Sequence, residues 1–170
     1  MKHGVIYGQG VVQMIKNVIF DIDGTLMNIE HRRKFVSGDK KNWKLFNEHI
    51  QFDTPNKIVF NMLDIFINDV KLGLKNIYFV SGRKEKYRDI TIKQICKYSC
   101  IDKIEIEDIN LYMRDNKDFR EDCLIKDDIL KNKLNHIPIE NLLVFDDRNS
   151  VVNNWREKRI TCFQVADGNF

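Results

Sequence analysis

The sequence of 170 residues predicts an α/β fold, with a mainly parallel sheet and helices on both of its faces. Short apolar runs typical of buried strands alternate with longer segments in which apolar residues recur at helical spacing. No repeat or low-complexity linker interrupts this alternation, and the only two prolines are Pro55 and Pro138. Because strands that alternate with helices form parallel sheets covered on both faces, we expect residues 1–170 to form one domain.

The expected elements follow one another in a regular order. Strands are expected at residues 18–20, 77–80, 111–113, 142–145 and 161–165, and helices at 84–98, 121–134 and 149–158. Another helix is expected from Thr54, which can cap it, through Pro55 in its first turn to a stop near Gly73. Its helical spacing is carried by Ile58, Met62, Leu63, Ile65, Phe66 and Val70. Residues 27–53 are then a small cap insertion, and residues 1–15, which resemble nothing else in the chain, a candidate leader.

Composition narrows the class of protein. With 43% hydrophobic and 31% charged residues, the chain is typical of a soluble globular protein. No stretch approaches the roughly 18 apolar residues of a membrane helix, and no secretory signal is evident, so we expect a cytoplasmic protein without a membrane partner. The four cysteines form no CxxC pair and the four histidines no HxxxH pair, which argues against zinc.

The most informative motif follows the first strand, where the chain reads Asp21-Ile22-Asp23-Gly24-Thr25. Side chains alternate along a strand, so both carboxylates project from one side of its carboxyl end, where ligands gather in open α/β sheets. Two such close carboxylates repel each other unless a hard cation lies between them, and their oxygens suit Mg²⁺. The alternative is an ordinary Asp-rich turn.

Two further strands end in polar clusters. The strand at residues 77–80 leads into Ser81-Gly82-Arg83, where a hydroxyl and exposed amides are good donors for phosphate oxygens. The strand at 142–145 leads into the acid pair Asp146-Asp147. Carboxyl ends of parallel strands share one edge of the sheet, so a site for magnesium and phosphate is expected there.

With these motifs in this order, the chain resembles the haloacid dehalogenase (HAD) superfamily of phosphohydrolases, which implies a Rossmann-like fold with a small helical cap. The motifs of the superfamily fall on Asp21 to Thr25, on Ser81, on Lys126 and on Asp146-Asp147. The third motif could also fall on Lys117, Lys131 or Lys133. We prefer Lys126 because Arg120, Asp122 and Lys126 fit a narrower resemblance.

The narrower resemblance is to the 3′-phosphatase domain of phage polynucleotide kinase/phosphatase, and it is clearest in roughly the last sixty residues. The sequence holds no GxxxxGK[ST] motif, so the resemblance covers the phosphatase only. It implies that Asp21 is the nucleophile, that Asp23 is the general acid and base, and that Lys126 steadies the phosphoryl group. Mg²⁺ would be held by Asp21, Asp23 and Asp146, with Asp122 and Asp147 in support. The residues expected to bind phosphate or substrate are Thr25, Ser81, Gly82, Arg83, Arg114 and Arg120. For the arginines, surface ion pairs are the alternative.

The function implied is the removal of 3′-phosphate from DNA or RNA ends through an aspartyl-phosphate intermediate. The alternative is a small-molecule phosphatase, such as a nucleotidase for nucleoside monophosphates. A silent binding module is a third hypothesis, against which the intact acids and Lys126 argue. No obligate protein partner is evident. A basic segment interleaved with aromatics could contact a nucleic acid strand or be a solvated face; it holds His31, Arg32, Arg33, Lys34, Phe35, Lys40, Lys41, Trp43, Lys44 and Phe46.

Overall fold

The central feature of the computed structural model is a sheet of five parallel strands in the order β5-β4-β1-β6-β7. The structure describes residues 15–101 and 110–168, so the candidate leader lies outside it except for Ile15. The strands are β1 (Asn17–Phe20), β4 (Asn76–Lys84), β5 (Leu111–Arg114), β6 (Leu142–Arg148) and β7 (Thr161–Gly168). The predicted fold class is confirmed.

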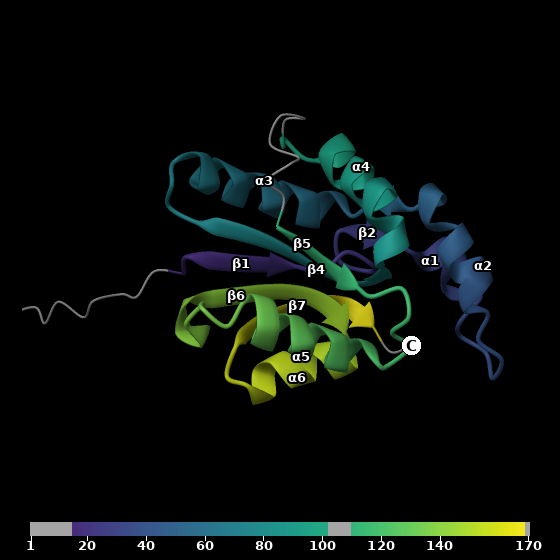
Figure 1. Cartoon of the computed structure of the whole chain (residues 1–170). Coiled ribbons are helices and arrows are strands. Elements are labelled where there is room, and N and C mark those ends of the chain that lie inside the picture. The colour runs from purple at the N-terminus through teal and green to yellow at the C-terminus, as the bar shows by residue number, and fades with distance from the viewer. Residues whose placement is uncertain (1–14, 102–109, 169–170) are drawn as a thin grey trace, which may run out of the picture.

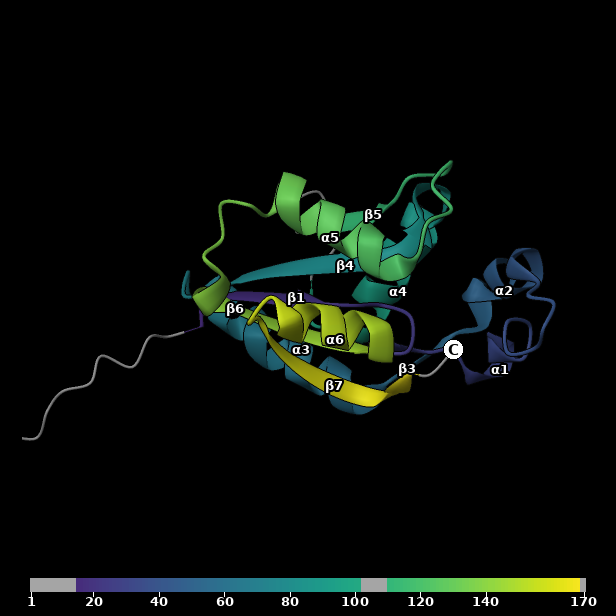
Figure 2. The same ribbon diagram turned by 90° about the horizontal axis from the view of Figure 1, so that it is seen from below.

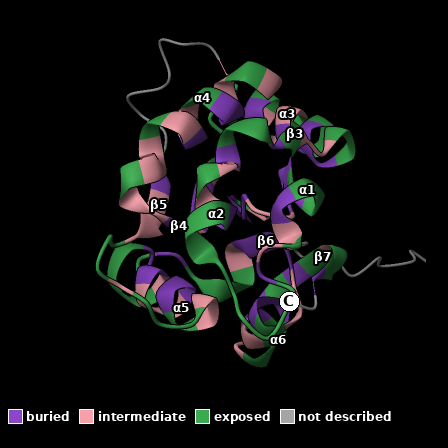
Figure 3. Ribbon diagram, turned by 90° about the vertical axis from the view of Figure 1, so that its right-hand side faces the viewer, coloured by how far each residue is buried: buried purple, intermediate pink, exposed green. Residues whose placement is uncertain are grey.

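Helices cover both faces of the sheet (Figures 1 and 2). On one face lie α3 (Lys57–Lys71) and α4 (Arg88–Tyr98), and on the other α5 (Asp122–Lys133) and α6 (Asn149–Glu157). Because side chains alternate along β1, Val18 and Phe20 join the core under α3, while Ile19 joins the core that contains Trp155 of α6. Buried residues accordingly lie in the strands and on the inner sides of the helices (Figure 3).

The cap insertion lies beyond the carboxyl ends of the strands (Figure 1). It consists of β2 (Met27–Asn28), α1 (Glu30–Arg33), α2 (Trp43–Glu48) and the 3₁₀ turn η1 (Ile50–Phe52), and β3 (Thr54–Pro55) closes it by pairing with β2. It has a small core of its own, formed by Ile29, Val36 and Phe46. The insertion therefore stands directly over the edge of the sheet at which the motifs end.

The expected start of the helix at Thr54 is wrong, because Thr54 and Pro55 pair with Met27 and Asn28 and the helix begins at Lys57. Its expected apolar face is also partly wrong: Ile58 and Ile65 are 76% and 56% exposed. The residues of α3 that are buried are Val59, Phe60, Leu63 and Ile67. Apolar residues occur on both sides of this helix, so spacing alone could not select the buried side.

The second strand is longer than expected. After Val80, β4 continues through the Ser-Gly-Arg motif to Lys84, with an irregularity in its pairing to β5 between Ser81 and Lys84. A 3₁₀ turn, η2 (Glu85–Tyr87), then precedes α4, so the helix expected at 84–98 begins at Arg88. A further turn, η4 (Ile139–Asn141), leads into β6. Among the described residues, no helix has the length and apolar character needed to cross a membrane.

Candidate active site

Three carboxylates meet at the carboxyl ends of β1 and β6. Asp21 directly follows β1, and its amide donates to the carbonyl of Phe145 at 3.0 Å, which fixes it beside Asp146 and Asp147 of β6. Each of the three acids contributes one carboxylate oxygen to a group whose atoms lie within 4.8 Å of one another. All three residues are buried, so their mutual repulsion is only weakly screened.

A lysine reaches this cluster from the other side. Lys126 of α5 places its Nζ 2.7 Å from Oδ1 of Asp21 and 2.8 Å from Oδ2 of Asp146. Burial lowers the pKa of Lys126, but Asp146 and Asp21 outweigh it and raise this pKa well above its ordinary value, so the side chain stays an ammonium. The competing lysines at 117, 131 and 133 are exposed, and the structure brings only Lys126 of these four to the acids.

The acid cluster fits a hard cation. Oδ2 of Asp21 and Oδ2 of Asp147 are buried without a hydrogen-bond partner, which is costly unless something else contacts them. Burial raises the pKa of Asp21 well above its ordinary value, and Asp146 and Asp147 add to the rise while Lys126 opposes it. Burial together with Asp146 raises the pKa of Asp147 to about 7. Oxygen ligands that repel one another in this way suit Mg²⁺.

Two glycines approach Asp147 closely. Gly24 has φ of +92°, and a Cβ added to it would lie 2.1 Å from Oδ2 of Asp147. A Cβ added to Gly168 would lie 2.4 Å from the carbonyl oxygen of Asp147. Neither position has room for a side chain, so the glycine after Asp23 is needed both for its conformation and for the close approach of the fourth motif.

Gly24→Ala is expected to lower both stability and activity. The positive φ alone costs about 1–3 kcal/mol of the free energy of unfolding, and the displaced Asp147 carboxylate adds to that and disturbs the acid cluster. Gly73→Ala is the matched control, because Gly73 also has a positive φ, +70°, but open space around it. Thermal unfolding and phosphatase assays of both variants separate the effect of backbone strain from the effect of displacing the Asp147 carboxylate. Equal effects of the two substitutions would contradict the role of Gly24.

Asp23 is clamped by two arginines. Its Oδ1 accepts hydrogen bonds from Nη2 of Arg32 at 2.6 Å and from Nε of Arg83 at 2.7 Å. Asp53, at the end of the cap, bridges the same two arginines, accepting from Nε of Arg32 at 2.6 Å and Nη2 of Arg83 at 2.7 Å. Burial raises the pKa of Asp23, but Arg32 and Arg83 outweigh it and lower this pKa to about 2. We call these four residues the arginine clamp.

Arg83 is engaged entirely with the protein. Besides Asp23 and Asp53, it donates from Nη1 to Oγ1 of Thr91 at 3.0 Å and to Oε1 of Gln94 at 2.7 Å. Its Nη2 also lies 2.6 Å from Oδ1 of Asp23, so each of the three guanidinium nitrogens has a partner in the protein. The sequence predicted that Arg83 binds phosphate, whereas the structure directs it at Asp23.

Of the other predicted phosphate ligands, Ser81 and Gly82 lie in the irregular end of β4, which we call the phosphate turn, and Thr25 lies in the segment after β1. Ser81 is buried, and its Oγ accepts from the amide of Arg83 at 3.2 Å. A Cβ on Gly82 would lie 1.9 Å from Oδ1 of Asp122, so the turn packs directly against the start of α5. Thr25 is buried with its Oγ1 lacking a hydrogen-bond partner, which leaves a hydroxyl for a ligand.

Arg114 and Arg120 differ in where they lie. Arg114 donates from Nε to the carbonyl of Gly82 at 2.8 Å and lies 3.3 Å from Asp122, which is itself 3.7 Å from Nζ of Lys126. Arg114 thus joins the phosphate turn to α5. Arg120 is exposed, and its Nη2 pairs with Asp118 at 2.6 Å and with Asp128 at 2.7 Å. Arg120 therefore makes surface ion pairs, and within the described part of the chain it has no hydrogen bond or ion pair with the acid cluster.

The basic segment of the cap is only partly a surface for ligands. Arg32 is fully buried in the arginine clamp, so neither alternative for the basic segment, strand contact or a solvated face, holds for this residue. Phe46 is buried in the core of the cap, whereas Lys40, Lys41 and Trp43 are exposed. Asp53 escaped the sequence analysis because no motif or strand end marks it.

The fold of this chain, with its acid cluster at the strand ends, is HAD-like. A HAD-like hydrolase, SP0104 from Streptococcus pneumoniae, superposes with a TM-score of 0.58 at 10% identity, covering 88% of this chain and 84% of that one. A putative β-phosphoglucomutase from Thermotoga maritima gives 0.55 at 14% identity over 88% and 84%. At these identities the likeness shows the fold alone.

The chain belongs to the family described as the phosphatase domain of the polynucleotide kinase PNKP, which it matches over residues 15–170. It is 29% identical to a chain of the Pnkp1/Rnl/Hen1 complex, with a TM-score of 0.62, covering 94% of this chain and 48% of that one. A chain of the Pnkp1/Rnl/Hen1 RNA repair complex is 28% identical, with a TM-score of 0.61, and covers 100% and 48%. This chain therefore spans about half the length of these relatives.

Proposed function

We propose that this chain is a Mg²⁺-dependent phosphomonoesterase that removes 3′-phosphate from DNA or RNA ends through an aspartyl-phosphate intermediate. One observation carries the proposal: a buried Asp21 has one oxygen on Lys126 and the other without a hydrogen-bond partner. One of the two oxygens of Asp21 would attack phosphorus, forming an O–P bond as the bond to the leaving sugar oxygen breaks, and the other would face the Mg²⁺.

The surrounding residues support both chemical steps. Lys126, together with Ser81, Gly82 and Thr25, would hold the transferring phosphoryl oxygens. Asp23 would give a proton to the leaving oxygen and then take one from water to cleave the aspartyl-phosphate. The arginines favour its ionised form, which suits the second step, and the negative charge of an entering phosphate shifts it toward the protonated form that the first step needs.

The acid cluster supports the proposed cofactor. Mg²⁺ held by Asp21, Asp146 and the main-chain carbonyl of Asp23 would supply positive charge to screen an anionic nucleophile from an anionic substrate. Asp147, beside its two glycines, would orient the groups around it. We further propose that residues 1–170 act as one HAD-type domain with a cap at 27–53. All the residues proposed for this mechanism lie in this chain.

Family membership and the modest cap support a nucleic acid end as substrate. The relatives at 28–29% identity are named for a complex that includes Rnl and Hen1, and one of them for RNA repair. The acid cluster by itself suits small phosphate esters equally well, so a nucleotidase is the second candidate function.

Phosphate release from four substrates separates these candidates: a 3′-phosphorylated DNA strand, the matching RNA strand, a 3′-nucleotide and a 5′-nucleotide. We expect kcat/KM to be highest for the strands, and EDTA to lower it by roughly 100-fold or more, with recovery on addition of Mg²⁺. Faster hydrolysis of the nucleotides than of the strands would favour the nucleotidase. Full activity in EDTA would contradict the metal requirement.

A further inference from the structure

The loop between β5 and α5, residues 115–121, carries an aromatic ring that the fold does not use. Phe119 is 83% exposed, the highest value among the large apolar side chains of the described residues. A single exposed apolar residue needs no explanation by itself. Its surroundings, however, are those of a binding surface.

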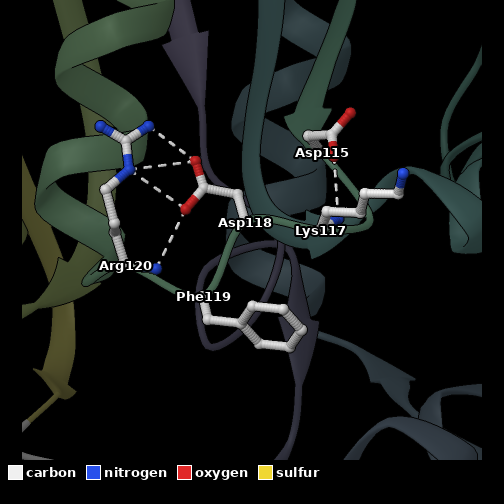
Figure 4. A pocket seen from close by; sticks show the side chains of 5 residues that line it. All are labelled: Asp115, Lys117, Asp118, Phe119 and Arg120. Atoms are coloured by element: carbon white, nitrogen blue, oxygen red, sulfur yellow. Dashed lines mark hydrogen bonds and ion pairs between the residues drawn. The ribbon is translucent and has the colours of Figure 1, made fainter.

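Hydrogen bonds fix this loop from both sides. Asn116 accepts from Nζ of Lys84 at 2.9 Å through its carbonyl, and from the amide of Lys86 at 2.9 Å through its side chain. Asp118 accepts from the amide of Arg120 at 3.0 Å and pairs with its guanidinium, and the ring of Phe119 points away from that pair (Figure 4). The loop that carries the ring is thus held in place, which lowers the backbone entropy lost when a ligand binds there.

One face of the ring already has a cation on it. Nζ of Lys84 lies 3.7 Å from the centroid of the Phe119 ring, and exposure leaves the remaining ring surface to solvent. Lys86, two residues after Lys84, places its Nζ 4.9 Å from the ring of Tyr87, and Lys117 is exposed on the loop. Basic side chains interleaved with aromatic rings are typical of surfaces that bind single-stranded nucleic acids.

The loop also lies next to the candidate active site. Arg114, just before the loop, donates a hydrogen bond to the carbonyl of Gly82. Asp122, just after the loop, lies near Nζ of Lys126. A wide hollow of about 550 Å³ opens along the loop, lined by Asp115, Lys117, Asp118, Phe119 and Arg120 (Figure 4). The loop and the cap lie at the same end of the sheet, beyond the carboxyl ends of the strands (Figures 1 and 2).

We propose that Phe119, backed by Lys84, is a stacking platform for a nucleobase of the substrate strand a short distance before its 3′-phosphate. The open side of the ring takes the base, and Lys84 and Lys117 attract the adjoining backbone phosphates. The inference deepens the proposed function and rests on it, because it assumes that the substrate is a strand.

Phe119→Ala and Phe119→Trp test the platform, with Leu72→Ala as control. Leu72 is 72% exposed but lies where α3 ends, at the opposite end of the sheet. Substrates are 3′-phosphorylated oligonucleotides of increasing length and nitrophenyl phosphate. We expect Phe119→Ala to raise KM for the longer oligonucleotides by roughly 5-fold to 100-fold at unchanged kcat, and to leave nitrophenyl phosphate unaffected. Phe119→Trp should keep the low KM, and Leu72→Ala should change nothing.

An abasic nucleotide placed at successive positions of the oligonucleotide locates the stacked base. When the abasic site replaces that base, the wild type and Phe119→Ala should have equal KM values. Fluorescence anisotropy of a labelled oligonucleotide gives Kd without turnover. Base stacking on Phe119 is therefore tested independently of the phosphatase reaction. Equal Kd values for the wild type and Phe119→Ala overturn the platform and leave the phosphatase standing. A Kd raised only in Phe119→Ala, in a protein that releases no phosphate, supports the platform and overturns the proposed reaction.

Discussion

Asp21→Asn is expected to lower phosphate release by at least roughly 10⁴-fold, because an amide oxygen cannot replace the attacking carboxylate. Stability should be preserved or raised. Asp21 is buried among like charges that raise its pKa, so a neutral side chain of the same shape relieves repulsion with Asp146 and Asp147. Lys126 keeps Asp146 as its partner at 2.8 Å.

The measurement is phosphate release from nitrophenyl phosphate, paired with thermal unfolding of the same protein. Asp39→Asn, at an exposed position of the cap, is the control for loss of one negative charge. Trapping of a phosphorylated protein in the wild type, and its absence in Asp21→Asn, would place the covalent step on this residue. Substantial turnover by Asp21→Asn would refute the mechanism.

Asp53→Ala is expected to be the most damaging change outside the acid cluster. The Asp53 side chain has 0% exposure and lies between two buried guanidinium groups, so its removal leaves two cations with Asp23 alone. The free energy of unfolding should fall by about 3 kcal/mol. Because Asp23 then loses its fixed position, kcat should fall by roughly 100-fold, and further on a sugar phosphate than on nitrophenyl phosphate.

A second variant separates positioning from stability. Arg32 and Asp53 are the two residues of the arginine clamp that come from the cap. The double substitution Arg32→Met with Asp53→Leu replaces this buried ion pair with apolar side chains, which is often neutral for stability. We expect this double variant to unfold near the wild-type temperature and yet to retain the catalytic defect. Recovery of activity along with stability would show that Asp53 acts only through the fold.

Much of the site was predictable from sequence because strand ends are predictable. Once the apolar runs were assigned to a parallel sheet, Asp21, Ser81 and Asp146 had to meet at one edge. Lys126 needed the family resemblance, since nothing in helical spacing distinguishes it from the exposed lysines nearby. The structure places it on the acids.

The arginine clamp was not predictable in the same way. Arg32 and Asp53 are 21 residues apart in an insertion with little periodicity, and their pairing depends on how the cap folds over the sheet. Arg32 therefore resembled one more surface cation in a basic run. The exposed side of α3 was misjudged for a related reason, because Ile58 and Ile65 have the same apolar character as the buried Leu63 and Ile67.

The arginine clamp joins the cap to the sheet through three fully buried charged side chains, those of Arg32, Asp53 and Arg83. Gln94 of α4 adds a hydrogen bond to the carbonyl of Ile50 at 2.7 Å. Swinging the cap outward would pull these charges apart without replacing their partners, at a cost of several kcal/mol. We therefore expect the mouth of the site to keep one width throughout the catalytic cycle. Strand ends would then be selected by whether they fit that opening, and the departing phosphate would leave without waiting for a lid.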